Sequence, residues 1–252
     1  MYPAAFVVAT IYSLLFVRNS LAVTIEVLYV YAIGIIWVLG VYASMIATKI
    51  NMSKFKSINA YKSVVTIILA IIFLNEFELL DPSSMEGGQN LAGVSLFVFA
   101  LGLNLKLEND SKEANKVVLF GIIFALLHGI ATFLVKIVVE DLEPSVILMH
   151  QYFISTIVMW LITIVRKIPI KLPRRQILFS WSAGFITFFA LVTFYQALNI
   201  GPASIITPTR AILGTILGIA MGMIIFGERK LLDNKEKIAI AISIISLLLF
   251  VL

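Results

Sequence analysis

The sequence predicts an all-α, polytopic membrane protein of about nine transmembrane helices. Apolar residues make up 61% of the 252 residues and charged residues only 13%, and the mean hydropathy is +1.05. Soluble domains average about 45–50% apolar and about 25% charged residues. A chain of this length cannot bury so much apolar surface from water, so its solvent is expected to be lipid.

Nine apolar segments approach the roughly 20 residues that a spanning helix needs. Short polar or helix-breaking segments separate them: Arg18 with Asn19, the segment 81–84, Pro169 with Pro173, and Gly201 with Pro202. No soluble domain fits between them. The predicted helices are 2–17, 24–48, 58–75, 89–105, 117–139, 144–165, 177–198, 203–226 and 238–252.

The basic residues predict the orientation in the membrane. If the helices alternate in direction, sixteen of the 19 Lys and Arg residues lie on one side, Arg18 lies opposite, and Lys136 and Arg210 fall within helices. The positive-inside rule then places the N-terminus in the cytoplasm and the C-terminus outside, in a multi-pass protein expected in the plasma membrane. The sixteen are Lys49, Lys54, Lys56, Lys62, Lys106, Lys112, Lys116, Arg166, Lys167, Lys171, Arg174, Arg175, Arg229, Lys230, Lys235 and Lys237.

Several classes of function lack the residues that they need. The net charge of +5 comes from short clusters and forms no continuous basic stripe, so we expect no nucleic-acid partner. The chain has no cysteine and contains no zinc-protease, serine-hydrolase or phosphate-loop motif. We therefore expect no enzymatic activity, no cofactor and no metal site.

The two halves of the chain repeat the same order of features. Pro3 and Pro144 each begin an apolar helix that ends in a basic residue, Arg18 or Arg166. In each half a later helix ends in an acidic residue, Glu76 or Glu228, for which a structural role at the membrane boundary is expected. Pro3 and Pro144 begin on opposite sides, so the halves are predicted to be inverted repeats, the arrangement of alternating-access carriers.

The segment 195–204, YQALNIGPAS, followed by Phe226, Gly227 and Glu228, resembles the EamA-like domains of the drug/metabolite transporter superfamily. That resemblance implies ten helices in two five-helix inverted repeats around a central cavity. It assigns 1–105 to an incomplete first repeat of four helices, 106–116 to a linker and 117–252 to a second repeat of five. The first helix of the family pattern is missing, because Pro3 matches the proline that begins the second helix of its repeat. The family also keeps both termini in the cytoplasm, unlike the orientation predicted here.

Arg210 is the strongest candidate for substrate binding. An arginine within a membrane helix costs at least ~2.5 kcal/mol on insertion scales, so a partner is expected. It precedes Gly214, Gly218 and Gly222, whose four-residue spacing predicts a smooth face for helix packing. Arg210 is therefore predicted to point into protein and to bind an anion. The alternatives are snorkelling or a structural pair with Glu140.

His128 is the second candidate, at the middle of helix 117–139. Thr132 and Lys136 follow it at intervals of four and predict one polar stripe beside an aqueous path. His128 can bind substrate or relay protons, or make an interhelical hydrogen bond. For Lys136, snorkelling or an exposed pair with Glu140 is favoured.

Each of the remaining candidates has a structural role as an alternative to substrate binding. His150, Gln151 and Ser155 can line a cavity wall or form interhelical hydrogen bonds. Tyr195 can contact substrate or mark the interfacial belt, and Trp37 can stack on substrate or pack in the core. Lys62 occupies roughly the position of Arg210 in the inverted half, which suggests a basic gate, although an interfacial lysine would look the same.

These residues predict a secondary carrier for a small polar metabolite. No acidic residue lies in the middle of a predicted helix, so an anionic or zwitterionic substrate is favoured over a cationic drug. The expected partners are the substrate, the lipid bilayer and a second copy of the chain. The alternative is a non-transporting or truncated membrane protein that acts as an assembly partner through its glycine face.

Overall fold

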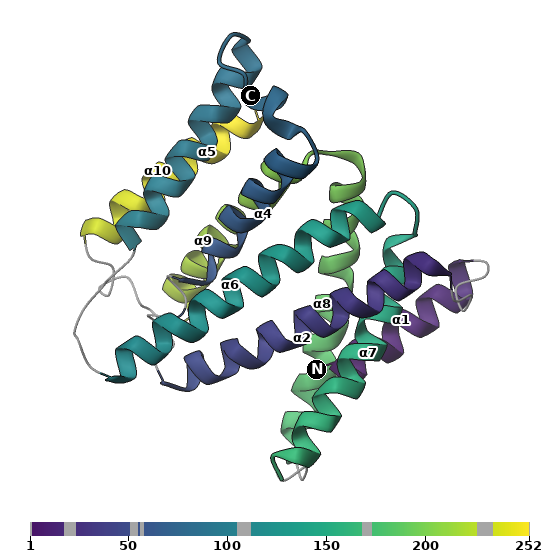
Figure 1. Ribbon diagram of the computed structural model, residues 1–252. Coiled ribbons are helices and arrows are strands. Elements are labelled where there is room, and N and C mark those ends of the chain that lie inside the picture. The colour runs from purple at the N-terminus through teal and green to yellow at the C-terminus, as the bar shows by residue number, and fades with distance from the viewer. Residues whose placement is uncertain are drawn as a thin grey trace. The chain divides into compact units, whose positions relative to one another are not determined.

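The computed structural model describes residues 2–17, 24–50, 55, 58–104, 112–167, 173–225 and 234–251, which form helices joined by short turns (Figure 1). Each predicted apolar segment corresponds to one helix, which confirms the all-α class. A short 3-10 helix, η1, is added between two of them. The elements are α1 Tyr2–Phe16, α2 Ile25–Ile50, α4 Tyr61–Phe73, η1 Glu76–Leu80, α5 Met85–Asn104, α6 Lys112–Val138, α7 Pro144–Val165, α8 Arg174–Ile200, α9 Ala203–Ile225 and α10 Asn234–Val251.

The boundaries around η1 differ from the predicted ones, and α6 begins at Lys112, five residues earlier than predicted. Asn75 has a left-handed backbone with φ 57°, a conformation that ends helices, so α4 stops before the predicted residue 75. Asp81 and Ser83 then form a turn, in which the Ser83 N–H donates to the Asp81 carboxylate at 2.9 Å and lowers the pKa of that carboxyl. Ser84 Oγ accepts the Gly87 N–H at 3.0 Å and caps α5 four residues earlier than predicted.

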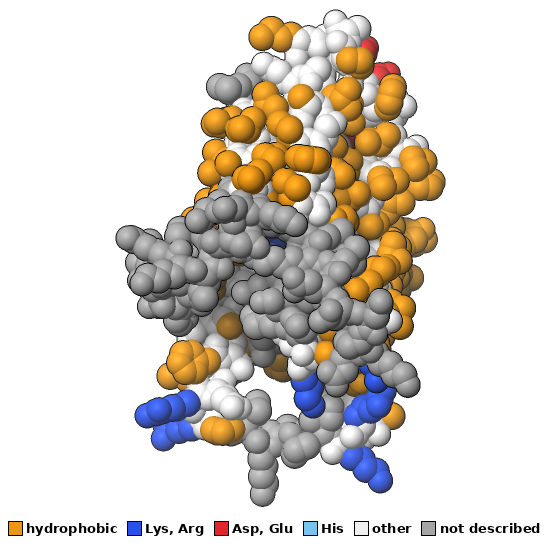
Figure 2. Space-filling model, turned by 90° about the vertical axis from the view of Figure 1, so that its left-hand side faces the viewer, with side chains coloured by type: hydrophobic (Ala, Val, Ile, Leu, Met, Phe, Trp, Pro, Cys, Tyr) orange, Lys and Arg blue, Asp and Glu red, His pale blue; other side chains and the backbone are white. Residues whose placement is uncertain are grey.

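Four of the described helices, α2, α6, α7 and α8, are long and apolar enough to cross a membrane by length and composition. Shorter apolar stretches occupy α1, α4 and α10. Hydrophobic side chains cover most of the described surface on the face in Figure 2. Side chains of this kind are stable against lipid and not against water, so the chain is an integral membrane protein.

The chain folds as two compact units. Unit 1 comprises Met1–Val41 and Ala131–Ile200, and unit 2 comprises Tyr42–Ile130 and Gly201–Leu252. Unit 1 therefore contains α1, α7 and α8, unit 2 contains α4, α5, α9 and α10, and α2 and α6 contribute to both. Each unit takes helices from both halves of the sequence. The repeat boundaries at 105 and 117 are not tested by this division and stay a prediction.

Small residues allow close helix packing in unit 1, where α1, α7 and α8 contact one another. Ala5 and Ala9 of α1 are fully buried. Gly34 of α2 lies so close to α7 that a Cβ there would be 2.9 Å from the Gln151 carbonyl oxygen. The aromatic ring of Tyr12 contacts that of Phe188 at 5.6 Å between centroids, which joins α1 to α8.

In unit 2, α4 packs on α9 and α5 packs on α10, as the paired ribbons in Figure 1 show. Ile67, Phe97 and Ile212 form a buried apolar cluster that joins α4, α5 and α9. Ser246 of α10 donates to the Gly93 carbonyl oxygen of α5 at 2.7 Å. These contacts bring together helices from the two halves of the sequence.

Candidate functional site

The six predicted binding residues form two groups, one in each compact unit. Unit 2 contains the basic group, and unit 1 contains the neutral polar group. The basic group is Lys62, His128 and Arg210, and the neutral group is Trp37, Gln151 and Tyr195.

A phenylalanine joins two members of the basic group. The Lys62 Nζ atom lies 5.6 Å from the ring centroid of Phe124, within the range of a cation–π interaction. The Phe124 and His128 rings lie 4.3 Å apart between centroids, at 35° to one another. Phe124 and His128 are one turn apart on α6, so this stack follows from helix geometry. Sequence reasoning missed Phe124, although its four-residue spacing from His128 was a usable signal.

Arg210 reaches the same region from α9. Ser63 Oγ of α4 donates to the Thr207 carbonyl oxygen of α9 at 3.4 Å, which places the residue after Lys62 beside the turn before Arg210. The positive charges of Lys62 and Arg210 are close enough to act on one another. Two like charges held on packed helices raise the energy of this region.

The surroundings of Arg210 and Gly214 differ from the predicted packing. Both residues are exposed, and a Cβ on Gly214 would have no described atom within 4 Å. The opposite side of α9, which includes Ile212, packs against α4 instead. No other helix of the described chain therefore covers Gly214. The surroundings of Gly218 and Gly222 lie outside the part of the structure that is described, and packing of the glycine face on another copy stays a prediction.

The neutral group is a buried hydrogen-bonded pair. The Tyr195 hydroxyl donates to Gln151 Oε1 at 2.8 Å, and the two residues are only 0% and 2% exposed. An interfacial-belt role for Tyr195 is therefore wrong, because a belt tyrosine keeps its hydroxyl in the polar layer. For Gln151, the bond from Tyr195 joins α7 to α8. Such an interhelical hydrogen bond was the alternative to lining a cavity. Trp37 is half-buried on α2.

A second polar pair lies beside it in unit 1. The Tyr31 hydroxyl and His150 Nδ1 are 3.1 Å apart, and their rings meet at 5.5 Å between centroids. Ser155 donates to the Gly34 carbonyl oxygen at 3.1 Å. The sequence predicted His150 and Ser155 as candidates. Tyr31 was missed, because Tyr31 and its partner His150 are 119 positions apart.

Glu76 has a structural role in unit 2, as predicted. Its two carboxylate oxygens accept the backbone N–H groups of Ala203 at 2.9 Å and Ser204 at 2.7 Å. These are the first residues of α9, whose N–H groups have no partner within the helix. Lys136 also has a structural partner, Glu140 Oε1 at 3.2 Å, which confirms the interpretation favoured for it. Glu228 lies outside the described residues.

The sequence profile of the EamA-like transporter family matches residues 115–252, more than half of the chain. The chain belongs to the EamA-like transporter family. The match covers nearly all of α6 and the four helices that follow it. A comparison with curated proteins gives no match.

The fold of this EamA-like chain is also similar to that of a solved structure described only as "Crystal structure of protein". The TM-score is 0.62 at 13% sequence identity, and the similarity covers 100% of this chain and 98% of the other. At that identity the likeness concerns the fold alone. The EamA-like family is a family of transporters.

Proposed function

We propose that this EamA-like chain is a secondary carrier that moves a small anionic or zwitterionic organic metabolite across the membrane, and that it is not an enzyme. The observation that supports the substrate class is the pair of cations on α4 and α9. Lys62 and Arg210 lie on packed helices, where Ser63 next to Lys62 bonds to the Thr207 carbonyl oxygen in the turn before Arg210, and the repulsion between their charges falls when an anion binds beside both.

The two cations have different roles in this proposal. The guanidinium of Arg210 offers a planar fork to a carboxylate or phosphate, whereas the Lys62 ammonium acts as a point charge. His128 of the stacked pair orients the substrate, while Gln151 and Tyr195 keep the helices of unit 1 in place. Rocking of one repeat against the other then exposes the substrate to each side in turn.

A thermal-shift screen of the detergent-purified protein tests the site. Carboxylates, amino acids, sugar phosphates, nucleotide sugars and quaternary amines are each added over a concentration series, since a ligand raises the Tm as its concentration exceeds its Kd. We expect a shift with one anionic or zwitterionic class that is lost in Arg210→Ala and weakened in Arg210→Lys and Lys62→Ala. Arg166→Ala, an exposed arginine at the end of α7, is the matched control. Unchanged shifts in both Arg210 variants would contradict the assignment.

Uptake of the ligand so identified into proteoliposomes tests the carrier function itself. Concentration of substrate that depends on a pH gradient in the parent protein, and is lost in His128→Ala, would support proton coupling through His128. Concentration that persists in His128→Ala removes that role and leaves the anion site intact.

One observation favours a second candidate, an assembly partner. Gly214 is open on α9, and a glycine allows another helix to approach closely. In this alternative a second copy of the chain docks there, and Gly214→Leu converts a dimer in detergent to a monomer, measured by light scattering. A monomer in both proteins, together with substrate uptake, would exclude it.

A further inference from the structure

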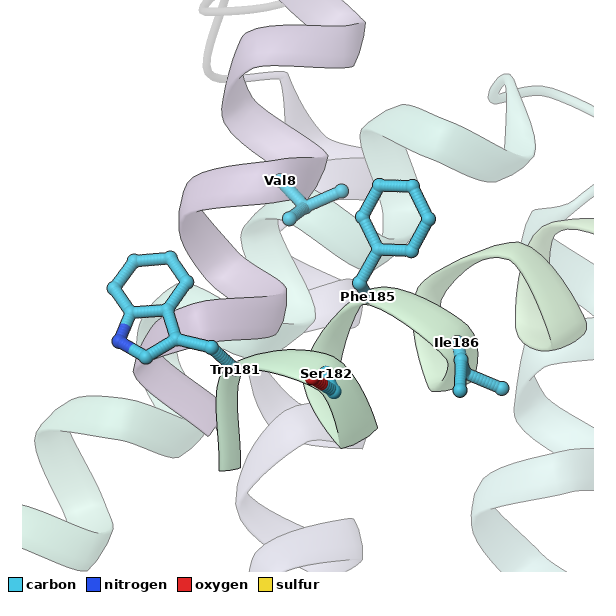
Figure 3. A pocket seen from close by; sticks show the side chains of 5 residues that line it. All are labelled: Val8, Trp181, Ser182, Phe185 and Ile186. Atoms are coloured by element: carbon cyan, nitrogen blue, oxygen red, sulfur yellow. The ribbon is translucent and has the colours of Figure 1, made fainter. Parts of the chain in front are cut away.

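A groove of about 390 Å³ lies between α1 and α8 in unit 1. Its lining residues are Val8, Trp181, Ser182, Phe185 and Ile186. Figure 3 shows Val8 projecting from α1 with Trp181 and Phe185 of α8 on either side of it in that view. The volume lies in the range of small-molecule sites, about 300–1,000 Å³. None of these residues belongs to the proposed transport site.

The lining of the groove suits hydrocarbon. Its hydrogen-bonding side-chain groups are the Trp181 indole N–H and the Ser182 hydroxyl, which already donates to the Leu178 carbonyl oxygen at 3.2 Å. Trp181 and Phe185 are 45% and 53% exposed, so their rings are open to an apolar occupant. A polar ligand would find few hydrogen-bonding groups to replace its water.

A basic residue continues the groove along α8. Arg174, Leu178, Trp181 and Phe185 follow one another at spacings of four, three and four, which is one face of an α-helix. All four are exposed. Arg174 begins the helix, about 10 Å from Trp181 along its axis at 1.5 Å per residue, and Arg175 is exposed beside it. Charge at the helix end followed by an apolar groove matches a molecule with an anionic head and a hydrocarbon tail.

The predicted membrane orientation places the groove beside anionic lipid. Val8 lines the groove together with Trp181 and Phe185, and the ring of Tyr12, one turn later on α1, contacts that of Phe188. The helices α1 and α8 therefore run in the same direction. The orientation predicted from the basic residues places both starts at the cytoplasmic surface. Anionic lipids are concentrated in that leaflet and attract basic side chains near the surface.

We propose that the groove between α1 and α8 binds an anionic phospholipid, with one acyl chain against Trp181 and Phe185 and the phosphate on Arg174 and Arg175. The occupant is a lipid of the cytoplasmic leaflet and not a free phosphate. Arg174 and Arg175 are exposed to solvent, so by themselves they would hold a free anion only weakly. The apolar groove supplies the rest of the affinity through burial of hydrocarbon.

Fluorescence quenching by brominated acyl chains tests the proposal, because Trp181 lines the groove. The full-length protein with Trp37→Phe and Trp160→Phe retains Trp181 alone and is placed in phosphatidylcholine vesicles that contain either brominated phosphatidylglycerol or brominated phosphatidylcholine. We expect phosphatidylglycerol to quench at a lower mole fraction, by about fivefold for each arginine that contacts it. Arg174→Ala with Arg175→Ala should remove that preference, and Val8→Phe, which fills the groove, should reduce quenching by both lipids.

Trp160 provides the matched control. It is 61% exposed and lies near the end of α7, at the same predicted membrane surface as Trp181. With Trp37→Phe and Trp181→Phe it should be quenched equally by both lipids. Equal quenching of Trp181 by the two lipids would mean that the groove contacts lipid without preferring an anionic head group. Loss of the preference on addition of inorganic phosphate would assign the arginines to a free anion, and either result would overturn the proposal.

Discussion

Glu76 shows how one side chain joins two distant segments. It is 7% exposed in η1, and its carboxylate accepts the first two N–H groups of α9, 127 and 128 positions along the chain. A negative charge at a helix N-terminus is stabilised both by these hydrogen bonds and by the helix dipole. Because Glu76 is buried, water does not readily replace these hydrogen bonds, so the residue should matter for stability.

Glu76→Gln should lower the stability of the detergent-solubilised protein by about 1.5–3 kcal/mol, the usual contribution of hydrogen bonds to a charged group. The amide keeps one acceptor oxygen but loses the charge. The change is measured as a lower Tm, with exposed Glu78→Gln as the control. A Tm equal to that of the control would show that the Glu76 carboxylate contributes little.

The Tyr195 and Gln151 pair allows a structural role to be separated from a binding role. Tyr195→Phe leaves the buried Gln151 Oε1 without its donor and should cost about 1–3 kcal/mol. Adding Gln151→Leu removes the orphaned group and should recover part of that loss, as a double-mutant cycle of melting temperatures would measure. Additive losses would mean that the hydrogen bond is not the source of the stability. Exposed Tyr29→Phe is the control.

Glycines set how closely the helices approach. Gly129 of α6 lies against α4, where an added Cβ would be 2.7 Å from the Lys62 carbonyl oxygen and 2.5 Å from the Val65 Cβ. Neither atom can move without its backbone. Gly102 of α5, in contrast, has no described atom within 4 Å of an added Cβ. The two glycines therefore differ in tertiary context although both are helical.

Gly129→Ala should destabilise the protein by about 1–3 kcal/mol, as overpacked cores do. Gly102→Ala should be neutral or stabilising by up to about 1 kcal/mol, because alanine is the better helix former. Melting of the two variants under the same conditions compares them directly. Similar losses in both would show that helix propensity, and not contact with α4, determines the result. Because Gly129 adjoins Lys62, binding in the thermal-shift screen should weaken only in Gly129→Ala.

The orientation of the whole molecule depends on its basic residues. Lys49 ends α2 and Arg174 begins α8, whereas the acidic Glu78 and Glu143 lie at the other predicted surface. The chain has no cysteine, so single cysteines report their own side of the membrane. Lys49→Cys and Arg174→Cys should react with an impermeant maleimide only after permeabilisation, and Glu78→Cys and Glu143→Cys before it. The reverse pattern would invert the predicted orientation.

The amino-acid sequence alone is enough for the membrane class, the all-α fold and the approximate place of each helix, although α5, α6, α8 and α10 begin three to five residues earlier than predicted. These properties depend on hydropathy over about 20 residues and on local helix ends such as Pro144. The resemblance to EamA-like domains is likewise carried by residues within one short segment, 195–204, and the family profile confirms it. The orientation and the substrate class are also sequence predictions, and the labelling and binding experiments test them.

Contacts between distant residues needed the tertiary structure. Three sets of contacts join positions from 66 to more than 140 apart. They are the bond from the start of α9 to Glu76, the pair of Tyr31 with His150, and the grouping of Lys62, His128 and Arg210. Hydropathy in a membrane identifies which segments are helices but not which helix faces meet, because lipid is as apolar as the side chains that it replaces. For the same reason the sequence predicted helix packing at Gly214, whereas no described atom lies within 4 Å of a Cβ added there.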